Sequence, residues 1–163
     1  MIEIRPFINQ DYPAIKNIYD MGIAAGNATF ETQSPEWEIF DKKFLPHSRF
    51  VSLEENTITG WIVLSNVSPR ECYKGVCELT LYVHDDFKYK GIGKALIEKV
   101  IVTSEKHGYW SMLAVIHNDN PASIHLHEKC GFRMIGYRER IAFLNGVWKT
   151  TVIMEKRSNT IGI

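Results

Sequence analysis

The stretch from residue 77 to residue 94 reads CELTLYVHDDFKYKGIGK, and the rest of the chain can be organised around it. Its first seven residues are mostly apolar or β-prone and predict a strand over 77–83. Alternation along a strand sets Glu78, Thr80 and Tyr82 on one face and leaves the apolar side chains on the other. The glycine-containing end of the stretch opens a helix that we expect to reach residue 108.

The loop between this strand and this helix is suited to holding an anion. The first turn of a helix has unpaired N–H groups, and the positive end of the helix dipole attracts negative charge. Glycine lets the backbone approach a ligand closely, and three lysines accompany the glycines in the segment Lys88, Tyr89, Lys90, Gly91, Ile92, Gly93 and Lys94. The segment is neither a Walker loop nor a dinucleotide fingerprint, because GxxxxGK[ST] and the third glycine are absent. A plain loop with a flexible cap is the alternative at this point.

Strand and helix signals follow each other along the rest of the chain. Strands are expected over 2–5, 50–53, 58–64, 77–83, 112–116, 135–143 and 147–154, with a turn at Asn145-Gly146 between the last two. Helices are expected after Asp11, from Ser34-Pro35 to about Leu45, over 91–108, and from Asn120-Pro121 to Gly131. This order predicts an α/β (α+β) fold with a mixed sheet and helices on its faces. We expect a single domain over 1–156 and a short polar tail, 157–163, that frays.

Composition excludes several classes of protein. The 163 residues carry 19 basic and 19 acidic side chains, whereas a general nucleic-acid binder needs a surplus of positive charge. The balance is uneven: residues 1–83 hold 7 basic and 11 acidic side chains, and residues 84–163 hold 12 and 8. The start of the chain is no signal peptide, and no apolar run approaches the ~20 residues that span a membrane. The three cysteines form no CxxC pair, so we expect reduced thiols in a cytoplasmic protein.

Glu78 is the first candidate for chemistry. A carboxylate inside an apolar strand is costly to bury, and burial raises its pKa toward the range of a general base. A solvated edge strand is the alternative. Ser123 and His127 lie four residues apart on one face of the last helix, although a helical histidine is usually surface decoration. None of the six histidines shows metal-ligand spacing, so no metal is expected.

Two loops supply weaker candidates. Arg70 carries a planar fork suited to a carboxylate, but a lone loop arginine is more often a solvated charge. Phe30 lies in the loop over 27–31, where an aromatic ring lines a pocket or plugs the core.

These elements, in this order, resemble the GCN5-related N-acetyltransferase (GNAT) superfamily and, within it, the phosphinothricin-type N-acetyltransferases. The loop over 27–31 is similar to that family's "atFe" loop, and Arg70 with Tyr73 is similar to its Arg-x-Ala-Tyr segment. The strand from Glu78 and the loop from Lys88 to Gly93 are similar to its V-E-x-S-V-Y-V strand and Q/R-x-x-G-x-G/A pyrophosphate loop. The matches N-x-x-S-x-x-L-H-E-x-x-G-F from Asn120 and G-x-W from Gly146 complete the set. Six motifs in register cover nearly the whole chain.

The resemblance implies the GNAT fold, with a mixed, mostly antiparallel central sheet of about six or seven strands flanked by about four helices. It implies acetyl-CoA as the donor. The pantetheine arm is expected on the main chain of Leu81, Tyr82 and Val83, and the pyrophosphate on the amides of residues 88–94. Asn120 and Ser123 are also assigned to the donor.

The resemblance also implies a mechanism and an acceptor. Glu78, directly or through a water, acts as the general base, and His127 as the acid for the leaving thiolate. The acceptor is a small amino-acid-like amine of the phosphinothricin or methionine sulfoximine type. Arg70 is expected to hold its carboxylate, with Phe30 and Tyr73 as walls. A homodimer is expected, without nucleic-acid or membrane partners. The alternatives are a protein Nα- or lysine acetyltransferase and a non-catalytic CoA-binding module.

Overall fold

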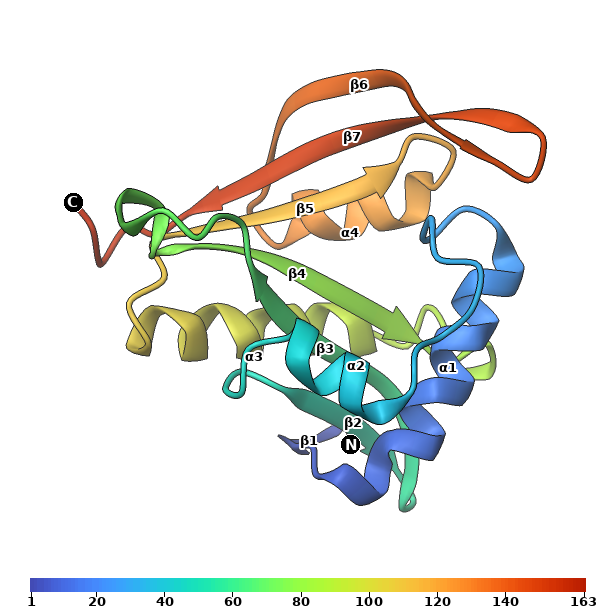
Figure 1. The fold of residues 1–163 in the computed structure, drawn as a ribbon. Helices are drawn as coiled ribbons and strands as arrows, with labels where there is room; N and C mark the ends of the chain where they lie inside the picture. The colour runs from blue at the N-terminus through green and yellow to red at the C-terminus, as the bar shows by residue number, and fades with distance from the viewer.

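The computed structural model describes residues 1–163 and contains one seven-stranded sheet with helices on both faces (Figure 1). The strands are β1 (Glu3–Pro6), β2 (Phe50–Glu54), β3 (Thr57–Asn66), β4 (Val76–Val83), β5 (Ser111–His117), β6 (Arg133–Leu144) and β7 (Val147–Arg157). The helices are α1 (Tyr12–Ala25), α2 (Trp37–Lys43), α3 (Ile92–Lys106) and α4 (Pro121–Lys129). Short 3₁₀ turns occur at η1 (Asn9–Asp11), η2 (Glu71–Tyr73) and η3 (Asp85–Phe87).

The strands are ordered β1-β2-β3-β4-β5-β7-β6 in the sheet. Every neighbouring pair is antiparallel except β4 and β5, which are parallel and connected through α3. A parallel pair needs such a crossover, whereas the other neighbours include simple hairpins. The mixed, mostly antiparallel sheet with four helices confirms the predicted fold class.

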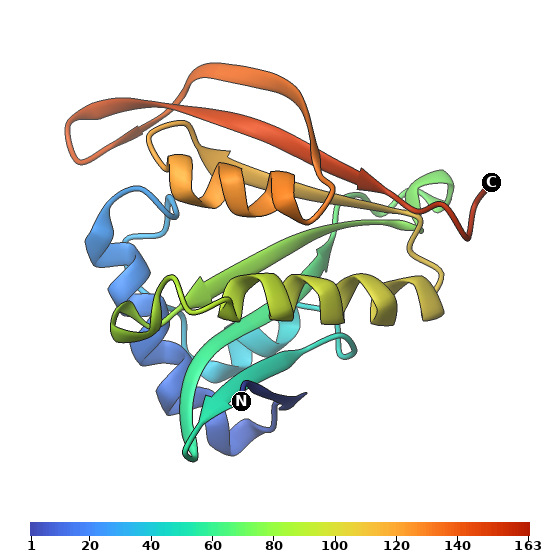
Figure 2. The same ribbon diagram turned by 180° about the vertical axis from the view of Figure 1, so that it is seen from behind.

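The sheet separates two apolar layers. Helices α1 and α2 cover one face, and α3 and α4 cover the other (Figures 1 and 2). Strand β3 supplies both layers, because Trp61 and Val63 belong to the cluster around α1 and α2, and Ile62 and Leu64 to the cluster around α3. A strand buried on both faces reads as a continuous apolar run, as residues 61–64 do.

Strands β4 and β5 separate soon after they begin. Their pairing is confined to Val76–Glu78 against Ser111–Leu113, although β4 continues to Val83 and β5 to His117. The two ribbons diverge beyond this point, and α1 and the loop that follows it lie at the open end (Figure 1). The facing edges of β4 and β5 therefore carry main-chain groups that have no strand partner.

The second helix begins later than predicted. Ser34 was expected to cap it, but α2 starts at Trp37, with the extended Glu36 before it. The Ser34 hydroxyl instead donates to Asp20 on α1 and accepts from Lys16, 2.6 Å away. Ser34 therefore ties the incoming loop to α1 and does not cap a helix.

Other local signals are confirmed. The Asn120 side chain accepts a hydrogen bond from the Ser123 N–H and so caps α4. Gly131 follows the end of α4 with φ of 86°, and Asn145 and Gly146 both take positive φ in the β6–β7 turn.

The tail is held more firmly than expected, because the Ser158 N–H donates to the Trp110 carbonyl and the Ser158 hydroxyl donates to Glu105. None of the helices combines the length and apolar character that crossing a membrane requires.

Candidate active site

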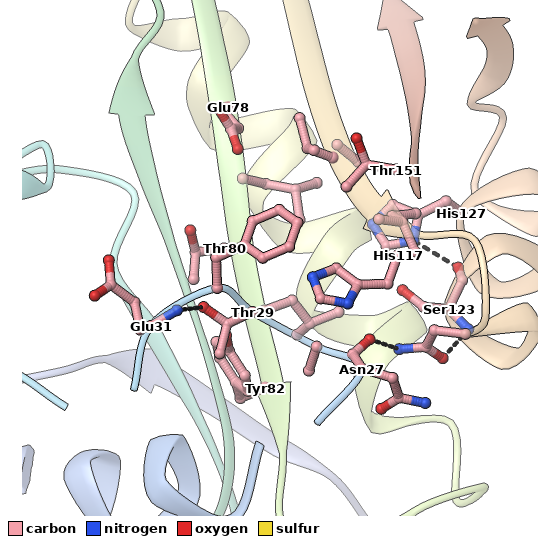
Figure 3. A pocket seen from close by; sticks show the side chains of 18 of the residues that line it. Asn27, Thr29, Glu31, Glu78, Thr80, Tyr82, His117, Ser123, His127 and Thr151 are labelled. Carbon is pink, nitrogen blue, oxygen red and sulfur yellow. Dashed lines mark hydrogen bonds between the residues drawn. The ribbon is translucent and has the colours of Figure 1, made fainter. Parts of the chain in front are cut away.

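A cavity of about 230 Å³ occupies the place where β4 and β5 diverge (Figure 3). We call it the first cavity. Its walls are the β4 residues 78–82, the β5 residues 114–117, the loop over 27–31, and the side of α4 that carries Ser123 and His127. It brings together Phe30, Glu78 and His127, which are far apart in the sequence.

Glu78 lies in this cavity as a half-buried carboxylate without a hydrogen-bond partner or an ion pair. The predicted alternation of β4 is confirmed, because Cys77 and Leu79 belong to the α3-side core and Tyr82 to the core on the opposite face. Withdrawal from water raises the pKa of Glu78, and the positive charges of Lys43 and Arg138 act in the opposite direction. A carboxyl with a raised pKa and no partner is suited to accept a proton.

His127 lines the same cavity and has one ring nitrogen without a hydrogen-bond partner. Its Nδ1 lies 2.7 Å from the carbonyl oxygen of Ser123, one turn earlier on α4. A carbonyl only accepts, so Nδ1 carries the hydrogen, and Nε2, which has no partner in the protein, carries the lone pair. Burial lowers the pKa of His127 and the bond to Ser123 raises it by less, so the ring is neutral near pH 7. The Nε2 atom must therefore receive a proton before it can donate one.

A second cavity, of about 520 Å³, follows the end of β4 to the start of α3. It shares Asn27, Ala28, Leu81, Tyr82, Asn120 and Ser123 with the first cavity, so the two cavities adjoin. All predicted donor-binding residues line it except Lys90. The side chain of Asn120 is already engaged, because it caps α4 and donates to the Asn27 carbonyl.

The two glycines of the loop are each required for a different physical reason. Gly91 precedes α3 with φ of 84°, a conformation that favours glycine. Gly93 lies inside the helix, where a Cβ would come within 2.8 Å of the Leu126 side chain on α4. Gly93 therefore lets α3 and α4 pack closely at the cavity, a role that the sequence did not indicate.

The three lysines of the loop are exposed and make ion pairs at the surface. Lys88 pairs with Asp85, Lys90 with Glu54 and Lys94 with Glu98, at 2.6, 3.8 and 3.7 Å. Exposed pairs of this kind contribute only about 0–1 kcal/mol, so their lysines remain available to an anionic ligand.

Arg70 and Tyr73 are not brought to the site. They lie in and beside η2, at the start of β4, whereas the two cavities extend from its middle to its end. Arg70 lies over the Tyr73 ring at 5.6 Å, and Tyr73 is 45% exposed. Within one chain these two residues line neither cavity, so their predicted contact with an acceptor stays a prediction. Lys43 is the cationic side chain that lines the first cavity.

His117 and Thr151 line the first cavity but were not predicted. Both are buried, and neither the ring nitrogens of His117 nor the Thr151 hydroxyl has a partner within the protein. Alternation in β5 was the available signal for His117, because Met112, Ala114 and Ile116 belong to the α3-side core and the odd-numbered positions face the other way.

Comparison with known proteins shows which family and which relatives the chain is similar to. The family model described as "Acetyltransferase (GNAT) family" matches residues 13–132. A phosphinothricin N-acetyltransferase of Alcaligenes faecalis is 29% identical over 166 residues, covering 96% of this chain and 82% of the relative. An L-methionine sulfoximine/L-methionine sulfone acetyltransferase of Pseudomonas paraeruginosa is 31% identical over 98 residues, 60% of this chain and 57% of the relative.

A solved structure agrees with these relatives. The phosphinothricin acetyltransferase of Sinorhizobium meliloti, in complex with AcCoA, superposes with a TM-score of 0.88 at 27% identity, covering 96% of this chain and 88% of the other. With the family model spanning most of the chain and the GNAT arrangement of strands and helices in place, the protein is an enzyme that belongs to the acetyltransferase (GNAT) family.

Proposed function

We propose that the protein transfers the acetyl group of acetyl-CoA to the primary amine of a small amino-acid-like acceptor. The observation that carries this proposal is that the two cavities adjoin and share six lining residues. One ends at the lysine-rich start of α3, and the other holds the unpartnered Glu78 and the bare Nε2 of His127. An anionic donor and a cationic amine thus approach each other from opposite ends.

The second cavity receives the donor. The main chain of Leu81 to Val83 lies beyond the β5 pairing, so its free edge pairs with the amides of the pantetheine arm. The pyrophosphate lies at the start of α3, where the unpaired N–H groups and the dipole favour negative charge, beside Lys88 and Lys94. The thioester then reaches the junction of the cavities, near Leu81 and Ser123.

Glu78 is the general base of the proposed reaction. An amine that enters as an ammonium must lose a proton before its lone pair can attack the thioester carbonyl. Burial raises the pKa of Glu78 toward the range that suits a general base at neutral pH. A main-chain N–H near Leu81 stabilises the oxyanion that forms as nitrogen bonds to carbon. His127 gives the departing thiolate its proton after Nε2 has been protonated.

The acceptor is small. The first cavity has room for one amino-acid-sized molecule, and the ring of Phe30 forms part of its wall. We assign the acceptor's carboxylate to Lys43, because that residue lines the cavity and Arg70 does not. The names of the relatives, which act on phosphinothricin and methionine sulfoximine, support an acceptor of this class.

A homodimer is also proposed. The edge formed by β6 and β7 exposes several large apolar side chains: Tyr137, Ile141, Phe143, Val147 and Trp148. Phe143 and Trp148 are 61% and 60% exposed, and their rings pack on each other at 5.2 Å. An apolar cluster of this kind, on the hairpin that ends the sheet, is typical of a surface that another chain covers.

Thiol release from acetyl-CoA, measured across a panel of amines, tests the proposed function. The panel holds phosphinothricin, L-methionine sulfoximine, common amino acids, and peptides with a free N-terminus or lysine. Release with an amino-acid-like amine supports the proposal. Release with peptides alone identifies a protein acetyltransferase, and saturable acetyl-CoA binding without any release identifies a non-catalytic binding module.

A further inference from the structure

His117 occupies a place that the proposed reaction does not yet explain. It is the last residue of β5, beyond the point where β4 and β5 stop pairing. Extending the register that pairs Glu78 with Leu113 brings His117 level with Tyr82 across the gap. Its imidazole projects from β5 toward β4 (Figure 3), although only 3% of the residue is exposed.

Both nitrogens of this imidazole lack a hydrogen-bond partner in the protein. Asp119 and Lys149 are charged neighbours, but they bond each other at 2.7 Å. The Phe30 ring packs against the imidazole at 4.5 Å and offers no polar atom. Burying polar atoms without partners costs free energy, so packing alone does not account for a histidine here. His117 lines the first cavity, so a molecule bound there is a source of such partners.

Along the strands, His117 lies closer than Glu78 to the level at which the two cavities adjoin. The two cavities meet at Leu81 and Tyr82. A strand rises about 3.3 Å per residue, which puts Glu78 about 10 Å from that level, beyond hydrogen-bond reach. An amine that attacks a thioester at the junction therefore needs a nearer group to take its proton.

We propose that His117 is a further catalytic residue, whose imidazole binds the acceptor amine at the junction and accepts the proton that the nitrogen loses as it attacks. This inference rests on the proposed function. Glu78 takes the first proton, through a water, and leaves a neutral amine. The nitrogen–carbon bond then forms and the carbon–sulfur bond breaks. The second proton passes from the amine to His117, and the thiolate takes the proton that Nε2 of His127 had bound beforehand, so that amine and thioester become amide and thiol.

The surroundings keep His117 ready to accept a proton. Burial lowers its pKa, Asp119 raises it and Lys149 lowers it, so the ring is neutral at pH 7. The other titratable groups of the cavity wall are Tyr19, Glu31, Lys43, Glu78, Tyr82 and His127. Burial raises the pKa of Tyr19 to about 12 and that of Tyr82 further, so neither tyrosine competes for the proton at neutral pH.

The test compares His117→Gln with the wild type, using the best amine of the panel. Glutamine keeps hydrogen-bonding capacity but cannot act as a base at this pH. We expect kcat to fall about a hundredfold or more, the usual contribution of a general base, with the Kd for acetyl-CoA unchanged. His125→Gln is the matched control, because His125 is an exposed histidine on α4 and lines neither cavity. A kcat within threefold of the wild type overturns the proposal, whatever happens to KM.

A second measurement does not depend on the variant folding. The side-chain nitrogens of the histidines are followed by NMR in the wild-type protein with CoA bound, while L-methionine sulfoximine is added. We expect the His117 signals to shift with saturation. Signals that stay in place while binding saturates overturn the proposal. Wild-type thiol release is scored separately, so a failure of the proposed function is distinguished from a failure of the His117 assignment.

Discussion

Gly22 on α1 packs directly against the ring of Tyr82 on β4, and a β-carbon at Gly22 would lie 2.3 Å from Cε1 of that ring. The ring is held in place by stacking on Tyr19 at 4.9 Å and on Trp61 at 5.0 Å. Tyr82 lines both cavities. The absence of a side chain at Gly22 therefore fixes how closely α1 approaches the site.

Replacing Gly22 with alanine is expected to destabilise the protein. Overpacking costs about 1–3 kcal/mol, of which the better helix propensity of alanine returns roughly 1 kcal/mol. Urea unfolding measures the difference. Gly136→Ala is the control, because a Cβ at Gly136 meets nothing within 4 Å. A Gly22→Ala variant as stable as the wild type would contradict the close packing.

Glu78→Gln is expected to lower kcat by about 10²–10⁴-fold, because glutamine has the same shape and cannot take a proton. Calorimetric titration with acetyl-CoA should give an unchanged Kd. Glu71→Gln, at an exposed carboxylate paired only with Lys74, is the matched control and should be fully active. Full activity of Glu78→Gln would remove Glu78 from the mechanism.

The loop lysines are expected to differ in their effect on donor binding. Lys88 and Lys94 line the second cavity, whereas Lys90 turns to Glu54 and the ring of Phe87. Alanine at 88 or 94 should weaken binding of acetyl-CoA about fivefold, equivalent to about 1 kcal/mol. Alanine at 90 should have little effect. Acetyl-pantetheine, which has no phosphates, should bind all three variants alike, and an equal loss with this probe would argue against a phosphate contact.

Acid is expected to destabilise the fold through two histidines. Burial lowers the pKa of both His117 and His127. Below about pH 6.5 these two side chains therefore bind more protons in the unfolded chain than in the folded protein. The free energy of unfolding should therefore fall as the pH drops from 7 toward 5. The raised pKa of Glu78 acts in the opposite sense.

Urea unfolding at pH 7 and pH 5.5 checks this dependence. His127→Gln should lose less stability between the two values than the wild type, because it has one histidine fewer to protonate. His125→Gln, at an exposed site, should keep the wild-type dependence. Equal losses for all three proteins would contradict the assignment to the buried rings.

The apolar edge of β6 and β7 is expected to join two copies. A variant with glutamate at both Phe143 and Trp148 should sediment as a monomer where the wild type sediments as a dimer. Ile39→Glu is the control, since Ile39 is a single exposed apolar residue on α2, 63% exposed. A monomeric wild type at micromolar concentration would rule out the proposed homodimer.

Local patterns were enough to predict most of the elements. The alternation in β4, the cap at Asn120 and the Asn145-Gly146 turn depend on neighbours in the sequence, so they could be read directly. The late start of α2 could not, because Ser34 binds Asp20 across a loop.

Residues that line the two cavities were predicted where motifs and local structure agree, at Glu78, His127 and the start of α3. Others were missed where two distant segments decide the geometry. His117 faces the cavity only because β5 has left β4, and Gly93 matters only because Leu126 lies opposite. The Arg70 motif names residue types but does not say which end of β4 they occupy.

The short contact between β4 and β5 divides the sheet into two parts that are joined at one end. The two parts meet at Val76–Glu78 and Ser111–Leu113. The part with strands β1 to β4 and the part with strands β5, β7 and β6 diverge from there. A donor whose amides bond the free edge of β4 while its carbon chain lies against β5 takes the place of a strand between them. We expect the main-chain amide hydrogens on the facing edges of β4 and β5 to exchange more slowly when acetyl-CoA is bound than in the free protein.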